Sequence, residues 1–263
     1  MIKTDTIDQI AYELFKAERD AYEVTKFVDQ YPELDIEVAY EIQDKLISIK
    51  CQEEKTVISG RKLGLTSRAK QQMMGVHEPS YGVLLDNMKI GENKIISVKS
   101  FIHAKIEPEI AFVFKKDLNG PIVTVADVLE ATDYITPAME IIDSRYKNFN
   151  FTLIDVIADN SSSSRYILGS KRYKVEEVDL ELMGCMFKKN DEIFATSAAG
   201  SIMGNPARAI AWMANKLIAR GQNIKAGEIV LSGALTGAEA IASGDHFSVS
   251  FDGIGSLEVF FTE

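Results

Sequence analysis

The chain contains 263 residues, which is long enough for one large domain with a substantial buried core. Hydrophobic residues make up 46% and charged residues 26%, a composition that is typical of globular proteins and excludes a disordered chain. The formal charge is −10, from 29 Lys and Arg against 39 Asp and Glu, and an acidic chain without a basic block is not expected to bind nucleic acid.

The region at residues 1–55 is predicted to be helical. Ala39, Ile42 and Leu46 recur at spacings of three and four and form one apolar stripe. Pro32 divides the region into two helices, because proline disfavours helix at the residue before it. The N-terminus is charged throughout and lacks the apolar stretch of a signal peptide. No run in the chain approaches the roughly 20 apolar residues of a membrane helix, so we expect no membrane partner.

From Val57 onward, short apolar runs alternate with Gly and Asp, which is typical of strands joined by turns. Two helices interrupt them, one beginning after an N-cap at Thr124 and one running from Asn205-Pro206 to just before Gly221. The run at 161–164 is expected to be a loop. This mixture lacks regular βαβ alternation and predicts an α+β fold. Strands are predicted at 57–66, 106–114, 138–143, 227–233, 246–251 and 257–261.

The two cysteines, Cys51 and Cys185, are far apart and form no CxxC pattern. Free cysteines of this kind are usually buried packing residues, and reduced thiols are typical of the cytoplasm, where we expect this protein. The three histidines are dispersed and show no zinc-ligand spacing. The P-loop, HExxH, EF-hand and GxSxG patterns are also absent.

Two carboxylates occur close together in the predicted strand at 106–114. Glu107 and Glu109 would lie on one face, because successive side chains of a strand point to opposite faces. Carboxylates so close, beside apolar neighbours, repel one another unless a proton or a cation lies between them. A divalent cation that prefers oxygen ligands, such as Mg²⁺ or Mn²⁺, would satisfy both. The alternative is a solvent-facing edge strand, where alternating Glu is common and Pro108 is tolerated.

A third carboxylate, Glu140, lies between Met139 and Ile141 in an otherwise apolar run, where a lone Glu is hard to bury without a partner. Three Glu ligands would leave positions open on an octahedral ion for a bidentate substrate. The nearby Asp143 and Arg145 are at least as compatible with a local ion-paired turn as with a catalytic role.

Lys62 lies between Gly60 and Gly64, two residues that let the backbone approach a ligand. A lysine inside an apolar strand is costly unless it meets an anion or a carboxylate cluster. At such a site it can neutralise a substrate carboxylate or an enolate. A surface lysine at a strand end is the alternative.

These residues together resemble the fumarylacetoacetase superfamily, and more closely its branch of 2-hydroxypentadienoate hydratases and 4-oxalocrotonate decarboxylases. The resemblance covers nearly the whole chain. It implies a mixed β-roll or barrel core, with a catalytic domain at 56–263 preceded by the helical region at 1–55. It is carried by GRKLGLTSRAK at 60–70, GVHEPSYGVLLDNM at 75–88, KIEPEIAFVF at 105–114, PAMEIIDSR at 137–145, IADNSSSSRYILG at 157–169 and AGEIVLSGALTG at 226–237.

The resemblance also implies the site. Mg²⁺ or Mn²⁺ would be held by Glu107, Glu109 and Glu140, and Lys62 would be the essential lysine. The expected substrate is a small 2-keto dicarboxylate, and we expect a homo-oligomer and a complex with a partner hydratase. The residues expected to bind the substrate are Leu63, Ser161 and Thr236.

The two activities of the branch differ in their need for an acid. Hydratases resembling this chain tend to carry Asp in a PDFG or PDYG pattern, because adding water requires a proton donor or acceptor. Here the stretch begins Pro79-Ser80, so Ser80 replaces the acid, although His77 and Glu78 lie nearby and can compensate. The stretches at 144–160 and 25–43 look more like the decarboxylase branch.

We therefore expect metal-dependent decarboxylation of 2-oxo-3-hexenedioate (4-oxalocrotonate) to 2-hydroxypenta-2,4-dienoate and CO₂ in the meta-cleavage catabolism of aromatic compounds. The alternative is a 2-keto-4-pentenoate hydratase that adds water to 2-hydroxypentadienoate. A second alternative is a catalytically inert structural or interaction protein of the same fold, against which the intact lysine and glutamate set argues.

Overall fold

The computed structural model describes residues 2–68, 71–72, 75–92 and 94–263, so the last two residues of the motif at 60–70 lie outside it. The larger sheet contains β1 (Ile58–Gly64), β2 (Ser80–Leu85), β3 (Lys89–Ile90), β5 (Lys105–Phe114), β6 (Thr132–Ile142), β7 (Ser163–Leu168), β10 (Ile229–Leu231) and β11 (Glu239–Ala240). The smaller sheet contains β4 (Ile95–Ser97), β8 (Gly184–Lys189), β9 (Glu192–Ala198), β12 (His246–Phe251) and β13 (Gly255–Thr262). The α-helices are α1 (Thr4–Arg19), α2 (Ile36–Glu53), α4 (Val125–Ala131), α5 (Leu153–Ala158) and α6 (Pro206–Ala219).

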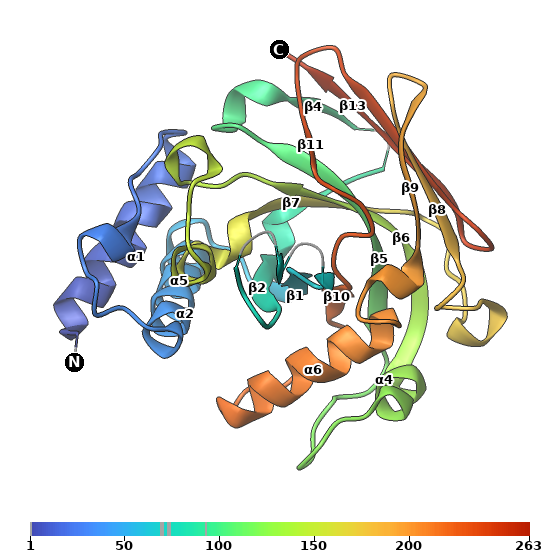
Figure 1. Cartoon of the computed structure of the whole chain (residues 1–263), viewed down its shortest axis with the longest axis horizontal. Coiled ribbons are helices and arrows are strands. Elements are labelled where there is room, and N and C mark those ends of the chain that lie inside the picture. The colour runs from blue at the N-terminus through green and yellow to red at the C-terminus, as the bar shows by residue number, and fades with distance from the viewer. Residues whose placement is uncertain (1, 69–70, 73–74, 93) are drawn as a thin grey trace.

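The larger sheet is curled and forms the centre of the molecule (Figure 1). Its strand order is β2-β1-β10-β5-β6-β7-β3, with β11 paired to β5 beyond the end of β10. Parallel pairing of β1 with β10 and antiparallel pairing of β10 with β5 bring segments from three parts of the chain side by side. The predicted α+β fold with a curled sheet core is confirmed.

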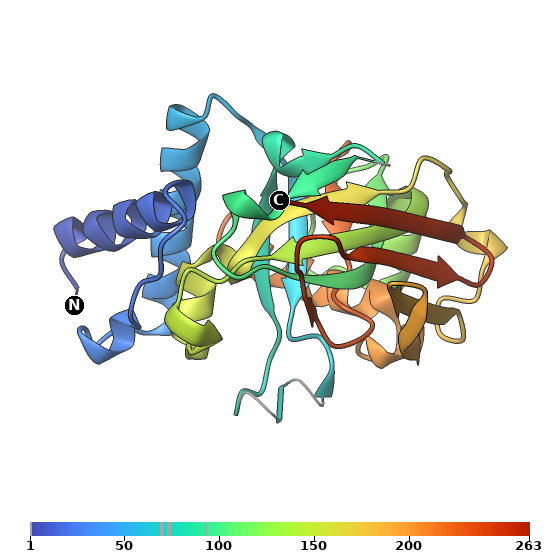
Figure 2. The ribbon, with the colours of Figure 1, turned by 90° about the horizontal axis from the view of Figure 1, so that it is seen from above.

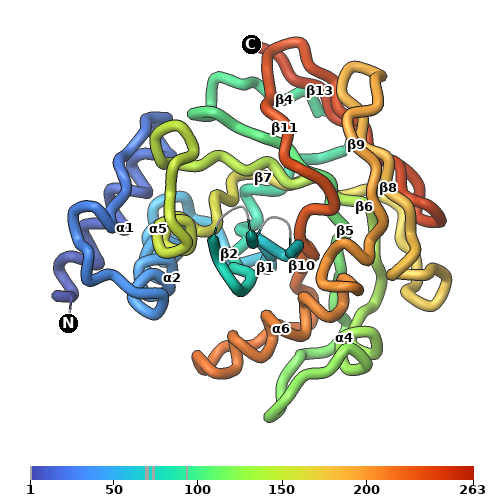
Figure 3. Tube along the Cα trace, viewed as in Figure 1, coloured from blue at the N-terminus to red at the C-terminus, as the bar shows by residue number. Residues whose placement is uncertain are grey.

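The smaller sheet has the strand order β4-β13-β12-β8-β9 and contains the last two strands of the chain. The hairpin of β12 and β13 turns at Asp252 and Gly253, where a hairpin was predicted. The tube in Figure 3 shows the chain ending at this sheet, far from its beginning beside α1.

The N-terminal helices group with α5 at one end of the molecule (Figure 2). The Asp35 carboxylate caps α2 by accepting from the Val38 backbone N–H at 2.9 Å, after the break that was predicted near Pro32. The Gln43 amide donates to the Tyr81 carbonyl at 3.0 Å and so fastens α2 to β2. In the described part of the chain, every helix is too short or too polar to cross a bilayer.

The two predicted internal helices begin at their predicted caps. The Thr124 side chain accepts from the Asp127 backbone N–H, and the Asn205 side chain accepts from the Ala207 backbone N–H. The strand after α4 is longer than the strand predicted at 138–143, because β6 starts directly at Thr132 and pairs with β5 along its whole length.

Among the described residues, seven strands were not predicted: β2, β3, β4, β7, β8, β9 and β11. The run at 161–164, which was predicted to be a loop, is divided. Ser161 and Ser162 form a turn, whereas Ser163 and Ser164 begin β7. Pairing with β6 stabilises β7 although serine has little intrinsic preference for strands, which illustrates that strand formation depends on tertiary context.

One hydrophobic core connects the N-terminal helices with both sheets. It includes Leu14 of α1, Leu46 of α2, Ile110 of β5 and Phe247 of β12. Both cysteines are free thiols; Cys185 is buried as predicted, but Cys51 is only half-buried.

Candidate metal centre and active site

The candidate site begins at the pairing of β5 with β6. The antiparallel register places Glu107 directly opposite Glu140, and Glu109 opposite Ala138. Because side chains alternate along a strand and directly opposed residues share a face, Glu107, Glu109 and Glu140 all project to one side of the sheet. Two segments about 30 residues apart in sequence thus supply three neighbouring carboxylates.

The strand that carries two of these carboxylates is central, so the alternative of an exposed edge strand is wrong. β5 lies between β10 and β6, and the exposed fractions of Glu107 and Glu109 are 6% and 0%. Pro108 is tolerated because β10 and β11 pair with β5 on either side of it and leave a gap. In that gap the Leu235 backbone N–H donates to the Pro108 carbonyl at 3.0 Å.

The three carboxylates form a compact buried cluster. One oxygen from each lies within 4.8 Å of the others. Burial, together with repulsion from the neighbouring carboxylates, raises the pKa of Glu109 and of Glu140. Within the described residues, Oε1 of Glu109 and Oε1 of Glu140 have no hydrogen-bond donor. Buried carboxylate oxygens without donors fit a hard divalent cation such as Mg²⁺ or Mn²⁺.

The loop after β10 supports the cluster through its backbone. The Gly233 N–H donates to Oε2 of Glu109 at 2.6 Å. Gly233 has a φ of +102°, and a Cβ at this position would lie 2.3 Å from Oγ1 of Thr66. Only glycine fits there, which explains the glycine of the SGALTG segment at 232–237.

Lys62 reaches the same cluster from β1. Parallel pairing aligns Lys62 with Leu231 of β10, and β10 in turn pairs with β5. The Nζ of Lys62 lies 3.0 Å from Oε2 of Glu140, and both side chains are buried. Burial disfavours the ammonium, but attraction to the three carboxylates outweighs it and raises the pKa of Lys62. The alternative of a surface lysine is therefore wrong.

The glycines on either side of Lys62 have different roles. A Cβ on Gly60 would lie 1.9 Å from the carbonyl oxygen of Ile229, so this glycine permits the close pairing of β1 with β10. The prediction that Gly60 allows approach to a ligand is thus wrong. Gly64 fits that prediction better, since it lines the cavity described next.

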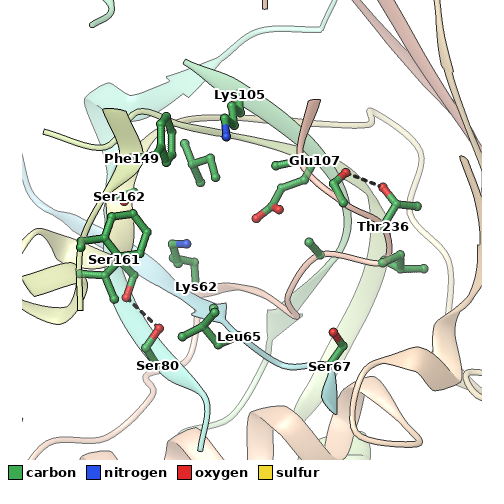
Figure 4. A pocket seen from close by; sticks show the side chains of 18 of the residues that line it. Lys62, Leu65, Ser67, Ser80, Lys105, Glu107, Phe149, Ser161, Ser162 and Thr236 are labelled. Carbon is green, nitrogen blue, oxygen red and sulfur yellow. Dashed lines mark hydrogen bonds between the residues drawn. The ribbon is translucent and has the colours of Figure 1, made fainter. Parts of the chain in front are cut away.

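A cavity of about 630 Å³ lies in front of the cluster (Figure 4). The side chains of Lys62, Glu107 and Lys105 point toward its centre from different walls. The remaining walls are mainly apolar and include Phe149 and Leu235. Apolar walls with a few converging charged groups are typical of a site for a small ligand.

Two of the three residues predicted to bind the substrate line this cavity. Ser161 and Thr236 are among the lining residues, and their role in binding stays a prediction. Leu63 is instead fully buried in the hydrophobic core, because its side chain points to the opposite face of β1 from the lysine before it. The prediction for Leu63 is wrong, and Leu65 lines the cavity in its place.

A left-handed turn presents Ser161 and Ser162 to the cavity. Asn160, Ser161 and Ser162 have φ values of 49°, 51° and 57°, which are uncommon for residues other than glycine. The Asn160 amide oxygen accepts from the Val83 N–H at 2.7 Å, and its NH₂ group donates to the Val83 carbonyl at 2.9 Å. This pair of bonds to β2 holds the turn in its strained conformation.

Sequence reasoning missed Lys105, Phe149 and Phe151 as cavity residues. Lys105 precedes Glu107 by two positions, so strand alternation alone indicates that both lie on the same face. The two phenylalanines carry no comparable signal, because their positions depend on the path of the connection between β6 and α5.

Asp143 and Arg145 stabilise the scaffold near the cavity. The Asp143 carboxylate accepts from the backbone N–H groups of Ile102 and His103, each at 2.8 Å. The fully buried Arg145 forms an ion pair with Asp159. Both residues therefore stabilise the structure, but the predicted local ion pair is wrong in its partner, because Arg145 pairs with Asp159 and Asp143 binds backbone N–H groups.

The two residues considered as substitutes for the missing acid lie outside the cavity lining. His77 is exposed, and the Glu78 carboxylate lies 2.8 Å from Nζ of Lys216 on α6. Ser80 does line the cavity, where the Ser161 hydroxyl contacts it at 3.2 Å. Among the described lining residues, Glu107 is the one acid, and it belongs to the cluster.

Comparison with known proteins reveals full-length similarity. A family model described as "Fumarylacetoacetate (FAA) hydrolase C-terminal" matches residues 58–261. The chain is 41% identical over 252 residues to 4-oxalocrotonate decarboxylase from Pseudomonas putida, covering 96% of this chain and 95% of that protein. It is 36% identical to 2-hydroxyhexa-2,4-dienoate hydratase from Comamonas testosteroni, covering 95% of each. A solved structure of 4-oxalocrotonate decarboxylase from Pseudomonas putida G7, complexed with magnesium and adipate, matches with a TM-score of 0.95, 37% identity and 99% of both chains.

Proposed function

This chain belongs to the fumarylacetoacetate hydrolase family, and from that premise we propose that it is a metal-dependent carbon–carbon lyase that decarboxylates 4-oxalocrotonate. The products are 2-hydroxypenta-2,4-dienoate and CO₂, a step in the meta-cleavage catabolism of aromatic compounds. The observation that carries the proposal is the convergence of Lys62 with the cluster of Glu107, Glu109 and Glu140 at one cavity.

We assign the metal site to the three carboxylates. Their buried oxygens provide an all-oxygen donor set, and the Gly233 N–H fixes the orientation of Glu109. A divalent cation held by these residues would supply a Lewis acid for the 2-keto acid end of the substrate. The cavity in front of the cluster leaves room for a small 2-keto acid.

Lys62 supplies positive charge beside the reacting carbonyl. Loss of the 6-carboxyl group as CO₂ sends its bonding electrons through the double bond toward the 2-oxygen and leaves a dienolate. A buried ammonium stabilises this developing charge more strongly than an exposed one, because water does not screen it. The ion pair with Glu140 holds Nζ at the cluster before the substrate binds, so little reorganisation is needed.

The lining of the cavity favours decarboxylation over hydration. Adding water to the dienol requires a proton donor or acceptor beside the diene. Ser80 lies where related hydratases carry Asp, and Glu78 is engaged by Lys216. The hydratase alternative would need the acid from elsewhere, and an inert protein would have no reason to retain a buried lysine among three buried carboxylates.

We further propose that the enzyme is a cytoplasmic homo-oligomer that forms a complex with a hydratase. Its product is an unstable dienol, and direct transfer to the enzyme that consumes it would limit loss to solution. Two free cysteines are consistent with a reducing compartment.

Product analysis with two separate substrates tests the proposal. The protein loaded with Mg²⁺ is incubated with 2-oxo-3-hexenedioate and, separately, with 2-hydroxypentadienoate. Release of CO₂ from the first without hydration of the second supports the decarboxylase. Hydration of the second without CO₂ release from the first identifies a hydratase, and turnover of neither indicates an inert protein.

A further inference from the structure

Lys105 is a charged cavity residue that the mechanism above does not use. It begins β5, two positions before Glu107, and therefore shares the face of the carboxylate cluster. Its side chain is half-buried and points into the cavity (Figure 4). Unlike Lys62, which is paired with Glu140, Lys105 has no acidic side chain within ion-pair distance among the residues that the structure describes.

The position of this ammonium is set by an aromatic ring. The Nζ of Lys105 lies 4.1 Å from the centroid of the Phe149 ring, which is a cation–π contact. Ile142 and Phe151 also line the cavity, so much of the wall around this ring and ammonium is apolar. A cation held against apolar groups has lost part of its hydration and gains more from an incoming anion than an exposed one would.

The chain maintains a strained turn to place that ring. Phe149 has a φ of 53° and Asn148 a φ of 57°, and a bulky residue in this region is a true outlier. The Glu23 carboxylate accepts from the Asn148 N–H at 3.1 Å and lies 3.2 Å from Nδ1 of His103. His103 in turn packs on Phe149 with ring centroids 4.6 Å apart. Strain that surrounding contacts maintain at a cavity wall is typical of a functional position.

We propose that Lys105 is a specificity-determining residue that binds the distal carboxylate of a dicarboxylate substrate. The inference rests on the proposed function for the other end of that substrate, the 2-keto acid at the carboxylate cluster. Residues two apart on a strand are separated by about 7 Å, a span comparable to an extended six-carbon dicarboxylate. The ammonium of Lys105 and the cluster can therefore contact the two ends of one molecule.

This arrangement distinguishes substrate from product. The substrate carries the distal carboxylate that is lost as CO₂, whereas the dienol product lacks it. The contact with Lys105 therefore exists before the reaction and disappears with it, so the product is held less tightly. Because the contact weakens as the carboxylate becomes CO₂, its loss is expected to raise KM without lowering kcat.

The test compares two stable ligands that differ only at the distal end. 2-Oxoadipate has both carboxylates and 2-oxohexanoate lacks the distal one; their binding to the Mg²⁺-loaded protein is measured by calorimetry. Lys105→Met should weaken 2-oxoadipate binding about 10- to 100-fold, the range for a hydrogen bond to a charged group, and leave 2-oxohexanoate binding unchanged. Lys105→Arg should retain most of the preference, and Lys116→Met, at an exposed lysine, should behave as the wild type.

Each result decides the inference separately from the proposed function. Unchanged 2-oxohexanoate binding also shows that the Lys105→Met protein is folded and that its site for the 2-keto acid group is intact. Equal weakening of both ligands, weakening of neither, or no preference in the wild type would overturn the role of Lys105. If the preference is lost in Lys105→Met but the wild type releases no CO₂ from 2-oxo-3-hexenedioate, the proposed reaction fails while Lys105 remains the carboxylate-binding residue.

Discussion

The Nζ of Lys62 and Oε2 of Glu140 lie 3.0 Å apart inside the protein, where almost no solvent reaches either side chain. The contact joins two requirements of the proposed reaction. The carboxylate belongs to the cluster proposed to bind the metal, and the ammonium faces the cavity in which negative charge would develop. In the proposed mechanism, this buried ion pair sets the distance between the metal site and the cation that acts on the substrate.

Replacing the buried lysine should impair chemistry more than binding. We expect Lys62→Met to lower kcat at least about 100-fold, the usual effect of removing one stabilising group at a developing oxyanion, with a smaller change in KM. Steady-state kinetics with 2-oxo-3-hexenedioate provides the measurement, and Lys99→Met at an exposed lysine serves as the control. A kcat for Lys62→Met close to that of the wild type would contradict the assigned role.

Removing one negative charge from the cluster should weaken metal binding. Glu109→Gln keeps an oxygen that can accept from the Gly233 N–H but loses the carboxylate charge. We expect the Mg²⁺ affinity to fall at least about 100-fold, more than for residues that only orient metal ligands. Calorimetric Mg²⁺ titration measures this, with Glu130→Gln at an exposed pair as the control. Equal Mg²⁺ affinities in the two variants would exclude Glu109 as a ligand.

Chelation of the wild type should abolish turnover, and added Mg²⁺ or Mn²⁺ should restore it.

A carboxylate introduced at position 80 should oppose the decarboxylase reaction. Ser80 is buried in the cavity wall and contacts Ser161, so Ser80→Asp places an unscreened negative charge near the dianionic substrate. We expect kcat/KM for decarboxylation to fall about 10-fold or more, since a like charge at short range costs at least 1.4 kcal/mol in such a site. Ser80→Asn has nearly the same shape without the charge and is the matched control. The explanation by charge fails if both variants lose activity equally.

The close pairing of β1 with β10 should depend on Gly60. In Gly60→Ala the new Cβ would lie 1.9 Å from the Ile229 carbonyl oxygen, a backbone atom that cannot move away cheaply. We expect the free energy of unfolding to fall by about 3 kcal/mol, the upper range for overpacking, and activity to fall because Lys62 shifts with its strand. Urea unfolding measures the first effect. In Gly91→Ala the Cβ would, among the described residues, meet the flexible Lys94 side chain at 3.6 Å, so wild-type stability is expected there. Wild-type stability of Gly60→Ala would show that the two strands can separate without cost.

Sequence patterns correctly predicted those features that depend on a single helix or strand. The alternation of a strand correctly places Glu107 and Glu109 on one face. The capping preferences of Thr124 and Asn205 correctly locate the beginnings of two helices. The resemblance of six ordered segments also anticipated the family and the curled sheet.

The tertiary structure decided everything that depends on which segments pair. The register of β5 with β6 brings Glu140 to Glu107, and the pairing of β1 with β10 brings Lys62 to both. Strand alternation could equally have described an exposed edge, and only the position of β5 inside the sheet shows that the carboxylates are buried. The tertiary structure also shows that Leu63 lies in the hydrophobic core, outside the cavity lining. The physical reason is that side-chain periodicity is a property of one strand, whereas burial and register depend on the packing of segments distant in sequence.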